Sequence, residues 1–500
     1  MSGQVYLGID LGAESGRVMA GVWDGRAMII EELHRFPNGP VHLAGTLRWD
    51  TLRLWSEIER GLAEGARRFG GRVQSVGVDT WALDYTLLSK SGETLGLPFN
   101  YRDARTRGVV EEMSGVASRE DIFEASGLQF MEINTLPQLI AHRRQSPEII
   151  AAADRFLMIP DYFNWLLCGA SVAEFTNATT TQFFHPRRHA WSVELLEKFG
   201  LPTRMLPEVV EPGTRLGRLR PDVAARAGLG QVEVVAPATH DTGSAVAAVP
   251  TTNTGRPNWA YISSGTWSLL GVETAQAVVT PAALARNVTN EGGVDGTYRL
   301  LKNIMGLWIL QRCRHAFAAA GRQLEYSDLV RLSAEAKPFE SLIDPDDSRF
   351  LNPPDMPSAI AGFCRETGQP EPRSQGAIVR CALESLALKY DLVLGWIEEL
   401  AGAKVEVVHI VGGGSRNDLL NQFAADACQR RVVAGPVEAT VLGNLLMQAR
   451  AFGELGSLAQ LRQAVAASGE TREFLPVHPA AWAEARARMS NLCAASTAPG

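Results

Sequence analysis

Apolar segments that end in glycine-rich or small polar turns constrain the fold of this chain most. Residues 5–12 (VYLGIDLG) form an apolar run that ends in Asp and Gly, which predicts a buried strand entering a turn. Residues 17–23 predict a second strand, Asp24-Gly25 a hairpin turn, and residues 28–34 a third strand. The chain therefore begins with antiparallel strands, not with a strand that leads directly into a helix.

A helix and a further strand follow this start. Asp50 is the expected N-cap of the helix, and residues 73–79 (VQSVGVD) predict another strand that ends in Asp. The helix is indicated by apolar residues at helical spacing: Leu54, Trp55, Ile58, Leu62 and Ala66. This order is typical of a mixed α/β layer.

The same order of elements recurs in the second half of the chain. Residues 258–272 predict a strand, a tight turn and a strand, and residues 405–411 predict a strand that leads into three glycines and a helix. Residues 250–257 have the composition of a loop. We therefore expect two related α/β domains, 1–245 and 246–500.

Composition excludes several classes of function. The net charge of −7 gives no basic surface for nucleic acid or an anionic membrane. No apolar stretch approaches the roughly 18 residues that a membrane span needs, and the start of the chain lacks a signal sequence. The six cysteines are scattered without zinc-site spacing, which favours reduced thiols. A cytoplasmic protein is the expectation.

The turn after the first strand has properties that a nucleotide phosphate requires. Residues 10–17 read DLGAESGR. The glycines allow the backbone to approach closely, Ser15 and Arg17 add donors, and the Asp10 carboxylate can hold Mg²⁺. A surface hairpin is the alternative. No GxxxxGK[ST] motif is present, so a P-loop fold is excluded.

Three further segments are rich in small residues. Ser264-Gly265-Thr266 and residues 412–417 (GGGSRN) follow predicted strands, and Gly443 lies in a helix of small residues that could pack closely on a neighbour. Each has a simple packing explanation. Together they suit a nucleotide cleft between two domains.

A His-Asp pair provides the candidate base. Residues 234–245 (VVAPATHDTGSA) place His240 and Asp241 at the end of an apolar strand, before a helix start. Phosphoryl transfer needs one carboxylate to accept the alcohol proton, and a helix N-terminus favours the ionised form. The alternative for Asp241 is an ordinary N-cap, and for His240 a structural histidine.

These motifs resemble those of the FGGY family of carbohydrate kinases. The resemblance rests on residues 8–17, 239–245 and 411–417, and on longer segments that resemble ketose kinases of this family. These longer segments are residues 78–84, 100–106, 158–163, 176–182, 287–293, 301–308 and 434–440. The match is collinear from about residue 5 to about residue 480.

The resemblance implies two ribonuclease-H-like (actin/hexokinase-like ATPase) α/β domains with a catalytic cleft between them. It implies MgATP as donor and a ketose primary hydroxyl, O1 of L-rhamnulose, as acceptor. Asp241 would be the proton acceptor and Asp10 would lie at the magnesium. The residues implied along the nucleotide are Ala13, Glu14, Ser15, Gly16, Arg17, Thr266, Gln311, Gly413 and Asn417. Those implied at the sugar are Ala82, His240, Thr242 and Asn303.

Two residues depart from the pattern of these ketose kinases. Ala82 stands where they have Gly beside the sugar, which leaves the choice of ketose open. Glu14 stands where they have Ser or Thr, and its carboxylate should face away from ATP or toward the metal, because it would otherwise repel the γ-phosphate. A kinase for L-fuculose or another ketose is one alternative. An actin-like ATPase that is not a kinase is another.

Overall fold

The computed structural model describes residues 3–496, and the chain forms two compact units in it. Among these residues, the first unit contains those up to residue 255, 273–300 and 439–469, and the second contains 256–272, 301–438 and those from residue 470 onward. The division expected at residues 245 and 246 assigns both later segments of the first unit to the C-terminal half. By packing they belong to the first unit, because α17 (Ala439–Ala451) lies against the first sheet.

The first unit is built on a six-stranded sheet whose order is β13-β14-β6-β1-β2-β3. β1 pairs antiparallel with β2 and parallel with β6, and β6 pairs parallel with β14. The strands are β1 (Gln4–Leu11), β2 (Ser15–Trp23), β3 (Met28–Pro37), β6 (Val73–Thr80), β13 (Thr214–Arg218) and β14 (Glu233–Ala236). The predicted strands over residues 5–34 and 73–79 are confirmed.

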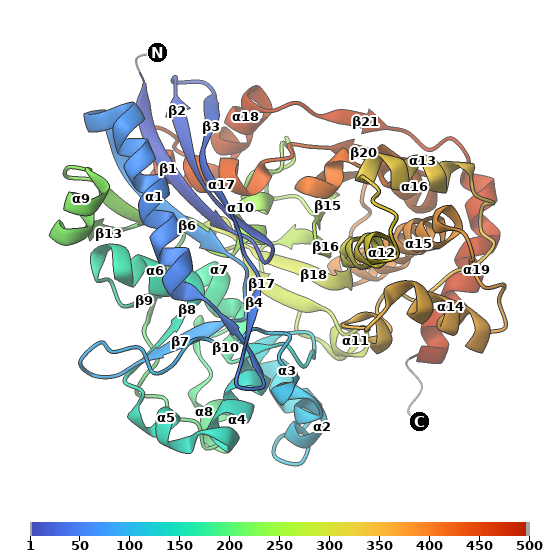
Figure 1. Ribbon diagram of the computed structural model, residues 1–500, viewed down its shortest axis with the longest axis horizontal. Coiled ribbons are helices and arrows are strands. Elements are labelled where there is room, and N and C mark those ends of the chain that lie inside the picture. Colours follow the sequence, from blue (N-terminus) through green and yellow to red (C-terminus); the bar gives the residue numbers. More distant parts are fainter. Residues whose placement is uncertain (1–2, 497–500) are drawn as a thin grey trace. The chain divides into compact units, whose positions relative to one another are not determined.

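Helices cover both faces of this sheet. α1 (Thr51–Phe69) begins at the predicted N-cap, since the Asp50 carboxylate accepts a hydrogen bond from the Arg53 amide. Leu7 packs against Gly65 of α1, while the next residue, Gly8, lies against α17. Because successive residues of a strand point to opposite faces, α1 and α17 lie on opposite sides of β1. Figure 1 shows α1 in blue alongside the strands.

The remaining elements of the first unit form four strand pairs and further helices. The pairs are β4 (Pro40–Leu43) with β5 (Thr46–Trp49), β7 (Tyr85–Leu88) with β8 (Arg155–Met158), β9 (Val172–Glu174) with β12 (Glu208–Val210), and β10 (Phe184–His185) with β11 (Ala190–Trp191). β17 (Thr289–Gly292) also lies in this unit. The helices are α2 (Val109–Met113), α3 (Arg119–Ser126), α4 (Thr135–Gln145), α5 (Pro147–Ala152), α6 (Ile159–Cys168), α7 (Phe175–Ala178), α8 (Val193–Lys198), α9 (Pro221–Ala227), α10 (Asp241–Ala247), α11 (Pro281–Ala285) and α18 (Leu458–Ser468).

The sheet of the second unit repeats the strand order of the first. β15 pairs antiparallel with β16 and parallel with β19, and β19 pairs parallel with β20. This sheet has seven strands in the order β17-β18-β16-β15-β19-β20-β21, and the six strands from β18 to β21 match β3-β2-β1-β6-β14-β13 in order. The strands are β15 (Trp259–Ser264), β16 (Trp267–Thr274), β18 (Tyr298–Met305), β19 (Val407–Val411), β20 (Arg431–Ala434) and β21 (Arg472–Phe474). The predicted recurrence of elements is confirmed.

Long helices complete the second unit. The 27-residue helix α15 (Gln375–Ala401) packs against α13, α16 and α19. The helices are α12 (Trp308–Ala319), α13 (Tyr326–Glu335), α14 (Met356–Glu366), α16 (Asp418–Cys428) and α19 (Pro479–Ser496). Leu420 on α16 is buried, whereas Leu419 is half-buried, because it lies at the edge of the apolar face. Within residues 3–496, none of the helices is both long and apolar enough to cross a membrane.

Candidate functional site

Three carboxylates meet at one edge of the first sheet. Asp10 near the end of β1 and Asp79 near the end of β6 are direct partners in the parallel pairing of these strands. Thr80, the last residue of β6, forms a parallel bridge with His240, the residue before Asp241. Because β1, β6 and β14 all run in the same direction, their carboxyl ends bring Asp10, Asp79 and Asp241 to the same edge.

Asp241 is the first residue of α10, and His240 occupies the N-cap position without a capping side chain. The Asp241 Oδ1 atom accepts hydrogen bonds from the amide and the hydroxyl of Thr242, at 2.5 and 3.1 Å. The alternative that Asp241 is an ordinary N-cap is therefore excluded, since its carboxylate binds the adjacent residue and not an amide one turn further along.

The environment of Asp241 disfavours its charge, contrary to the expectation from the helix terminus. Burial raises the pKa of Asp241 above its ordinary value and the charge of Asp10 adds to this, while the hydrogen bonds from Thr242 lower it. The side chain retains 30% exposure, so the carboxylate is accessible from one side. A carboxylate with a raised pKa that remains accessible is suited to accept a proton.

The turn after β1 carries the residues expected at the phosphates. The Gly12 amide donates to the Ser15 carbonyl at 2.9 Å, which closes a tight turn over Ala13 and Glu14. Glu14 is exposed on this turn. The Arg17 Nε and Nη2 atoms both bind Oδ2 of Asp10, at 2.9 and 2.7 Å. Arg17 is thus held by the residue that is expected to hold the metal.

Gly16 has a packing role in the same turn. A Cβ atom at Gly16 would lie 2.2 Å from the ring of Phe36 on β3. Since Gly16 is buried under this ring, its glycine identity is explained without a phosphate.

Asp79 is a carboxylate to which the sequence analysis assigned no role. Its Oδ2 accepts a hydrogen bond from Asn444 of α17 at 2.5 Å, and its buried Oδ1 has no hydrogen-bond partner. Burial raises the pKa of Asp79 well above its ordinary value, and the charge of Asp10 raises it further. The sequence signal that could have identified Asp79 was its position near the end of a predicted strand, and the structure shows that this strand pairs parallel with the strand of Asp10.

The backbone before Asp241 is held by a second buried carboxylate. Glu174 Oε2 accepts hydrogen bonds from the amide and hydroxyl of Thr239 at 2.8 and 2.7 Å, and from the hydroxyl of Thr176 at 2.6 Å. The His240 amide donates to that same Thr176 hydroxyl at 3.2 Å. These contacts fix the segment that carries His240 and Asp241.

Ala82 lies in the loop between β6 and β7, and hydrogen bonds of the neighbouring residues hold this loop in place. The indole of Trp81 donates to Asp84 Oδ2 at 3.0 Å, and Gln138 donates to Oδ1 at 2.9 Å. Leu83 has a φ of 77°, and its carbonyl accepts from the Thr135 hydroxyl at 2.7 Å. The loop that carries Ala82 is therefore rigidly held.

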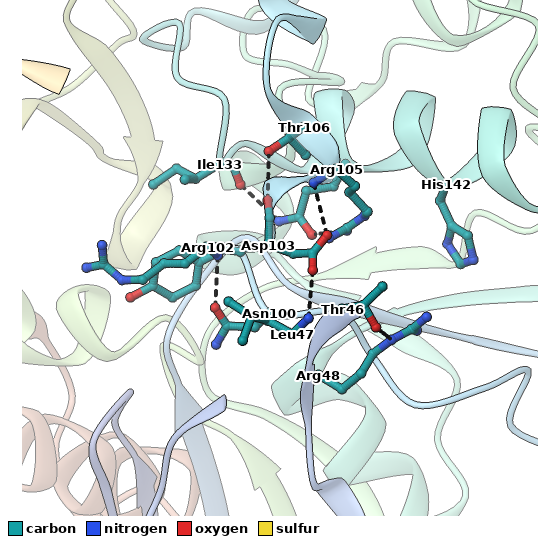
Figure 2. A network of polar contacts seen from close by, with 12 residues as sticks. Thr46, Leu47, Arg48, Asn100, Arg102, Asp103, Arg105, Thr106, Ile133 and His142 are labelled. Carbon is teal, nitrogen blue, oxygen red and sulfur yellow. Dashed lines mark hydrogen bonds and ion pairs between the residues drawn. The ribbon is translucent and has the colours of Figure 1, made fainter. Parts of the chain in front are cut away.

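The network in Figure 2 extends this anchoring to the segment 100–106. Figure 2 shows Asp103 between Leu47 and Arg105: its carboxylate accepts from the Leu47 amide at 2.6 Å and from the Arg105 amide at 3.0 Å. The Arg105 guanidinium donates to Gln138 at 2.7 Å, which in turn binds Asp84. The segment singled out in the sequence thus supports the Ala82 loop.

The residues expected along the nucleotide lie in the second unit at one edge of its sheet. The Thr266 carbonyl, in the turn between β15 and β16, accepts from the Trp308 amide at the start of α12, the helix that carries Gln311. A Cβ at Gly414 would lie 2.0 Å from the Ser264 hydroxyl, so the triple-glycine turn packs on the same turn.

The side chains of this group are available to different degrees. Gly413 is exposed, and the Gln311 Oε1 atom is buried without a hydrogen-bond partner. Asn417 caps α16 by accepting from the Leu420 amide at 3.1 Å, so contact with a ligand would come from its Nδ2 group. Asn303 lies half-buried on β18 in this second unit, whereas Ala82, His240 and Thr242 lie in the first.

Comparison with known proteins gives consistent matches. Residues 5–248 match the model of the N-terminal domain of the FGGY family of carbohydrate kinases, and residues 260–452 match its C-terminal domain. A rhamnulokinase of Bacteroides thetaiotaomicron is 43% identical over 98% of this chain and 99% of its own length. A rhamnulokinase of Pectobacterium atrosepticum is 42% identical over 99% of this chain and 97% of its own length.

Solved structures share the fold. A xylulose kinase of Lactobacillus acidophilus superposes with a TM-score of 0.82 at 14% identity, over 99% of both chains. A glycerol kinase of Plasmodium falciparum, solved with ADP, superposes with a TM-score of 0.76 at 15% identity, over 100% of this chain and 99% of the other. The predicted two-domain α/β fold is confirmed.

Proposed function

We propose that this chain, which belongs to the FGGY family of carbohydrate kinases, transfers the γ-phosphoryl group of ATP to O1 of L-rhamnulose. As a carbohydrate kinase, it acts on a small-molecule sugar and a nucleotide. The choice of L-rhamnulose is supported by its rhamnulokinase relatives, which match over nearly its whole length. The products would be L-rhamnulose 1-phosphate and ADP.

One observation carries the mechanism: an accessible carboxylate of raised pKa at the start of α10. In this proposal Asp241 accepts the proton of the sugar O1 as this oxygen attacks the γ-phosphorus and the bond to ADP breaks. The raised pKa makes Asp241 a stronger base than an ordinary aspartate, and its Thr242 hydrogen bonds keep Oδ1 oriented. We place His240, Thr242, Ala82 and Asn303 at the sugar.

The residues around Asp10 fit a Mg²⁺ ion. Mg²⁺ is commonly bound by one or two carboxylates together with substrate phosphates and water, and the two hydrogen bonds from Arg17 to Asp10 both go to Oδ2. No group of three or more His, Cys, Asp or Glu side chains within residues 3–496 forms a metal site, so the phosphates would have to complete the coordination. When bound, the ion would neutralise charge on the phosphate oxygens.

We assign the two substrates to different parts of the chain. The phosphate turn, with Ala13, Glu14, Ser15, Gly16 and Arg17, and the proposed base belong to the first unit. We place the rest of the nucleotide on Thr266, Gln311, Gly413 and Asn417 of the second unit.

We also propose that the reaction takes place in the cytoplasm. The structure forms no disulfide among its described residues, which fits a reducing compartment.

A coupled assay of ADP release tests this function. The purified chain is assayed with L-rhamnulose, L-fuculose, L-xylulose and no sugar, with and without Mg²⁺. We expect ADP release that depends on both L-rhamnulose and Mg²⁺. A preference for another ketose would make the chain a sister kinase. ATP hydrolysis that is indifferent to every ketose would favour an actin-like ATPase.

The variant Asp241→Asn tests the base. We expect kcat to fall by at least about 10²-fold, the lower end of the contribution of general base catalysis. The variant must retain the far-UV CD spectrum and thermal unfolding of the parent. Near-normal kinase activity in a folded Asp241→Asn protein would contradict the assignment.

A further inference from the structure

A buried ion pair lies directly behind His240. Arg299 on β18 is fully buried, and its Nη2 atom lies 3.2 Å from Oε2 of Glu291 on β17. The same Nη2 atom is 3.1 Å from Nδ1 of His240 in hydrogen-bond geometry, and Arg299 Nε donates to the Gly292 carbonyl at 2.9 Å. The boundary between the two units falls within β18, between residues 300 and 301, so all of these residues belong to the first unit.

The chemistry of Arg299 determines which nitrogen of His240 carries the proton. A guanidinium group is only a donor, so an N–H at Nδ1 would place two donors 3.1 Å apart. Nδ1 therefore accepts from Arg299, and the proton of the neutral ring lies on Nε2. Glu291 Oε2 lies 3.3 Å from Nδ1 and by itself would favour the opposite tautomer, but it is equally close to Arg299, at 3.2 Å, and the guanidinium charge offsets its attraction for a proton on Nδ1.

The proton on Nε2 faces the proposed base. Nε2 of His240 lies 3.4 Å from Oδ1 of Asp241. A sugar hydroxyl bound to Asp241 would bring the neighbouring oxygen of the acceptor close to this N–H. The ring can then donate to a lone pair of that oxygen, which a ring with an unprotonated Nε2 cannot do.

We propose that Arg299 and Glu291 are positioning residues that hold His240 as the neutral Nε2–H tautomer, a fixed donor for an oxygen of the acceptor sugar. Arg299 sets the tautomer, and Glu291 neutralises the buried guanidinium and fixes its orientation. The inference deepens the proposed function, on which it rests for the identity of the acceptor. It assigns a role to two residues that do not themselves contact the sugar.

Nuclear magnetic resonance of the ligand-free protein tests the tautomer without any activity. The chain has nine histidines, so ¹⁵N-histidine spectra are recorded for the parent and for His240→Gln, and the missing signals identify His240. We expect Nε2 to be protonated and Nδ1 to be bare. A proton on Nδ1, or on both nitrogens, would overturn the proposal.

Steady-state kinetics test the role at the sugar. Glu291→Leu with Arg299→Met removes the pair together, so that no single buried charge remains. We expect the KM for the ketose to rise by about tenfold, the value of one hydrogen bond, with the KM for ATP unchanged. Arg299→Lys keeps a donor beside Nδ1 and should recover most of the loss.

A second buried pair provides the matched control. Arg462 and Glu273 are equally buried in the same unit, 2.6 Å apart, and Arg462 binds Thr254 and Val246. Glu273→Leu with Arg462→Met should cost stability without raising the KM for the ketose. An equal rise in both double variants would reduce Arg299 and Glu291 to structural residues and overturn the proposal.

A double-mutant cycle through His240 completes the test. A glutamine amide can donate from the position of Nε2 without a tautomer, so in His240→Gln the Arg299→Met and Glu291→Leu changes should add little to the KM. The same tenfold rise in that background would contradict the proposal. If the parent protein releases no ADP with any ketose, the proposed function fails. The nuclear magnetic resonance measurement then still shows whether His240 is held as the Nε2–H tautomer.

Discussion

Gly443 of α17 packs against the backbone of Ser244 in α10: a Cβ atom at Gly443 would lie 2.0 Å from the Ser244 carbonyl oxygen. Since α10 begins at Asp241, Gly443→Ala would push the helix that carries the proposed base. We expect the free energy of unfolding to fall by about 1–3 kcal/mol, as for other overpacked sites. We also expect kcat to fall by up to about 10²-fold, because a displacement of about 1 Å can cost this much.

Gly395 in the middle of α15 is the control for this change. A Cβ there would meet nothing within 4 Å, so Gly395→Ala should stabilise the protein by up to about 1 kcal/mol through helix propensity alone. Urea unfolding and kcat are measured for both variants. Equal behaviour of the two alanines would mean that α10 and α17 are not closely coupled.

The Thr242 hydroxyl is expected to tune the pH dependence of catalysis. The base must be ionised, and burial raises the pKa of Asp241, so kcat should fall toward acid with a midpoint above the ordinary aspartate range. Thr242→Val removes a 3.1 Å hydrogen bond that favours the carboxylate. The acid limb of the kcat–pH profile should then move to higher pH, because the ionised carboxylate loses a donor that stabilises it.

Ser244→Ala removes a buried hydroxyl from the same helix as a comparison. That hydroxyl donates to the Ala238 carbonyl and not to Asp241. The acid limb of the kcat–pH profile of Ser244→Ala should coincide with that of the parent protein. A shift of equal size in both variants would mean that the Thr242 hydroxyl does not act through the carboxylate.

Much of the fold could be predicted because its determinants are local. Apolar runs ended by Gly or Asp located the strands over residues 5–34, and the Asp50 cap located the start of α1. The return of α17 to the first sheet could not be predicted in this way. It depends on Asn444 and Gln448 reaching β1 and β6, which are more than 360 positions away in the sequence.

The site was predictable only where a residue lies within a motif. Asp10 lies near the end of a strand, His240 and Asp241 follow one, and the resemblance gave them roles. Glu174, Glu291 and Arg299 act through contacts across the fold, and a single charge in an apolar segment does not reveal its partner. The pairing of Asp10 with Asp79 needed the parallel register of β1 and β6, which periodicity leaves open.

Asp84 should make stability depend on pH. Burial raises the pKa of Asp84 from 3.8 to about 6, although Trp49, Gln138 and Trp81 donate hydrogen bonds to it. The folded state therefore binds this proton more tightly than the unfolded chain does. Protonation of Asp84 therefore stabilises the fold fully below pH 4, and this stabilisation is lost as pH rises to about 6. The free energy of unfolding should change by about 3 kcal/mol over this range.

Asp84→Asn removes this titration. The free energy of unfolding of the variant minus that of the parent protein should increase by about 3 kcal/mol between pH 4 and pH 7. This change does not depend on how stable either protein is at pH 4. Urea unfolding at a series of pH values measures the difference. A difference that stays constant across this range would mean that Asp84 does not titrate there.

Glu174 should couple stability to catalysis through the Thr239 backbone. Its Oε2 accepts three hydrogen bonds, and burial raises the pKa of this carboxyl while the Thr176 and Thr239 donors lower it. In Glu174→Gln, an amide at the Oε2 position would face the Thr239 N–H as a second donor. A buried N–H without a partner costs about 1–3 kcal/mol, and we expect unfolding to become easier by this amount.

Thr239→Ser is the comparison, because it keeps both the amide and the hydroxyl that bind Glu174. Its stability and kcat should remain close to those of the parent protein, whereas Glu174→Gln should also lower kcat per folded molecule. The loss in kcat is expected because Thr239 directly precedes His240 and Asp241 in the chain. A less constrained backbone at Thr239 would let the Asp241 carboxylate adopt several orientations. A Glu174→Gln protein with lower stability but unchanged kcat would show that Glu174 supports the fold without positioning the base.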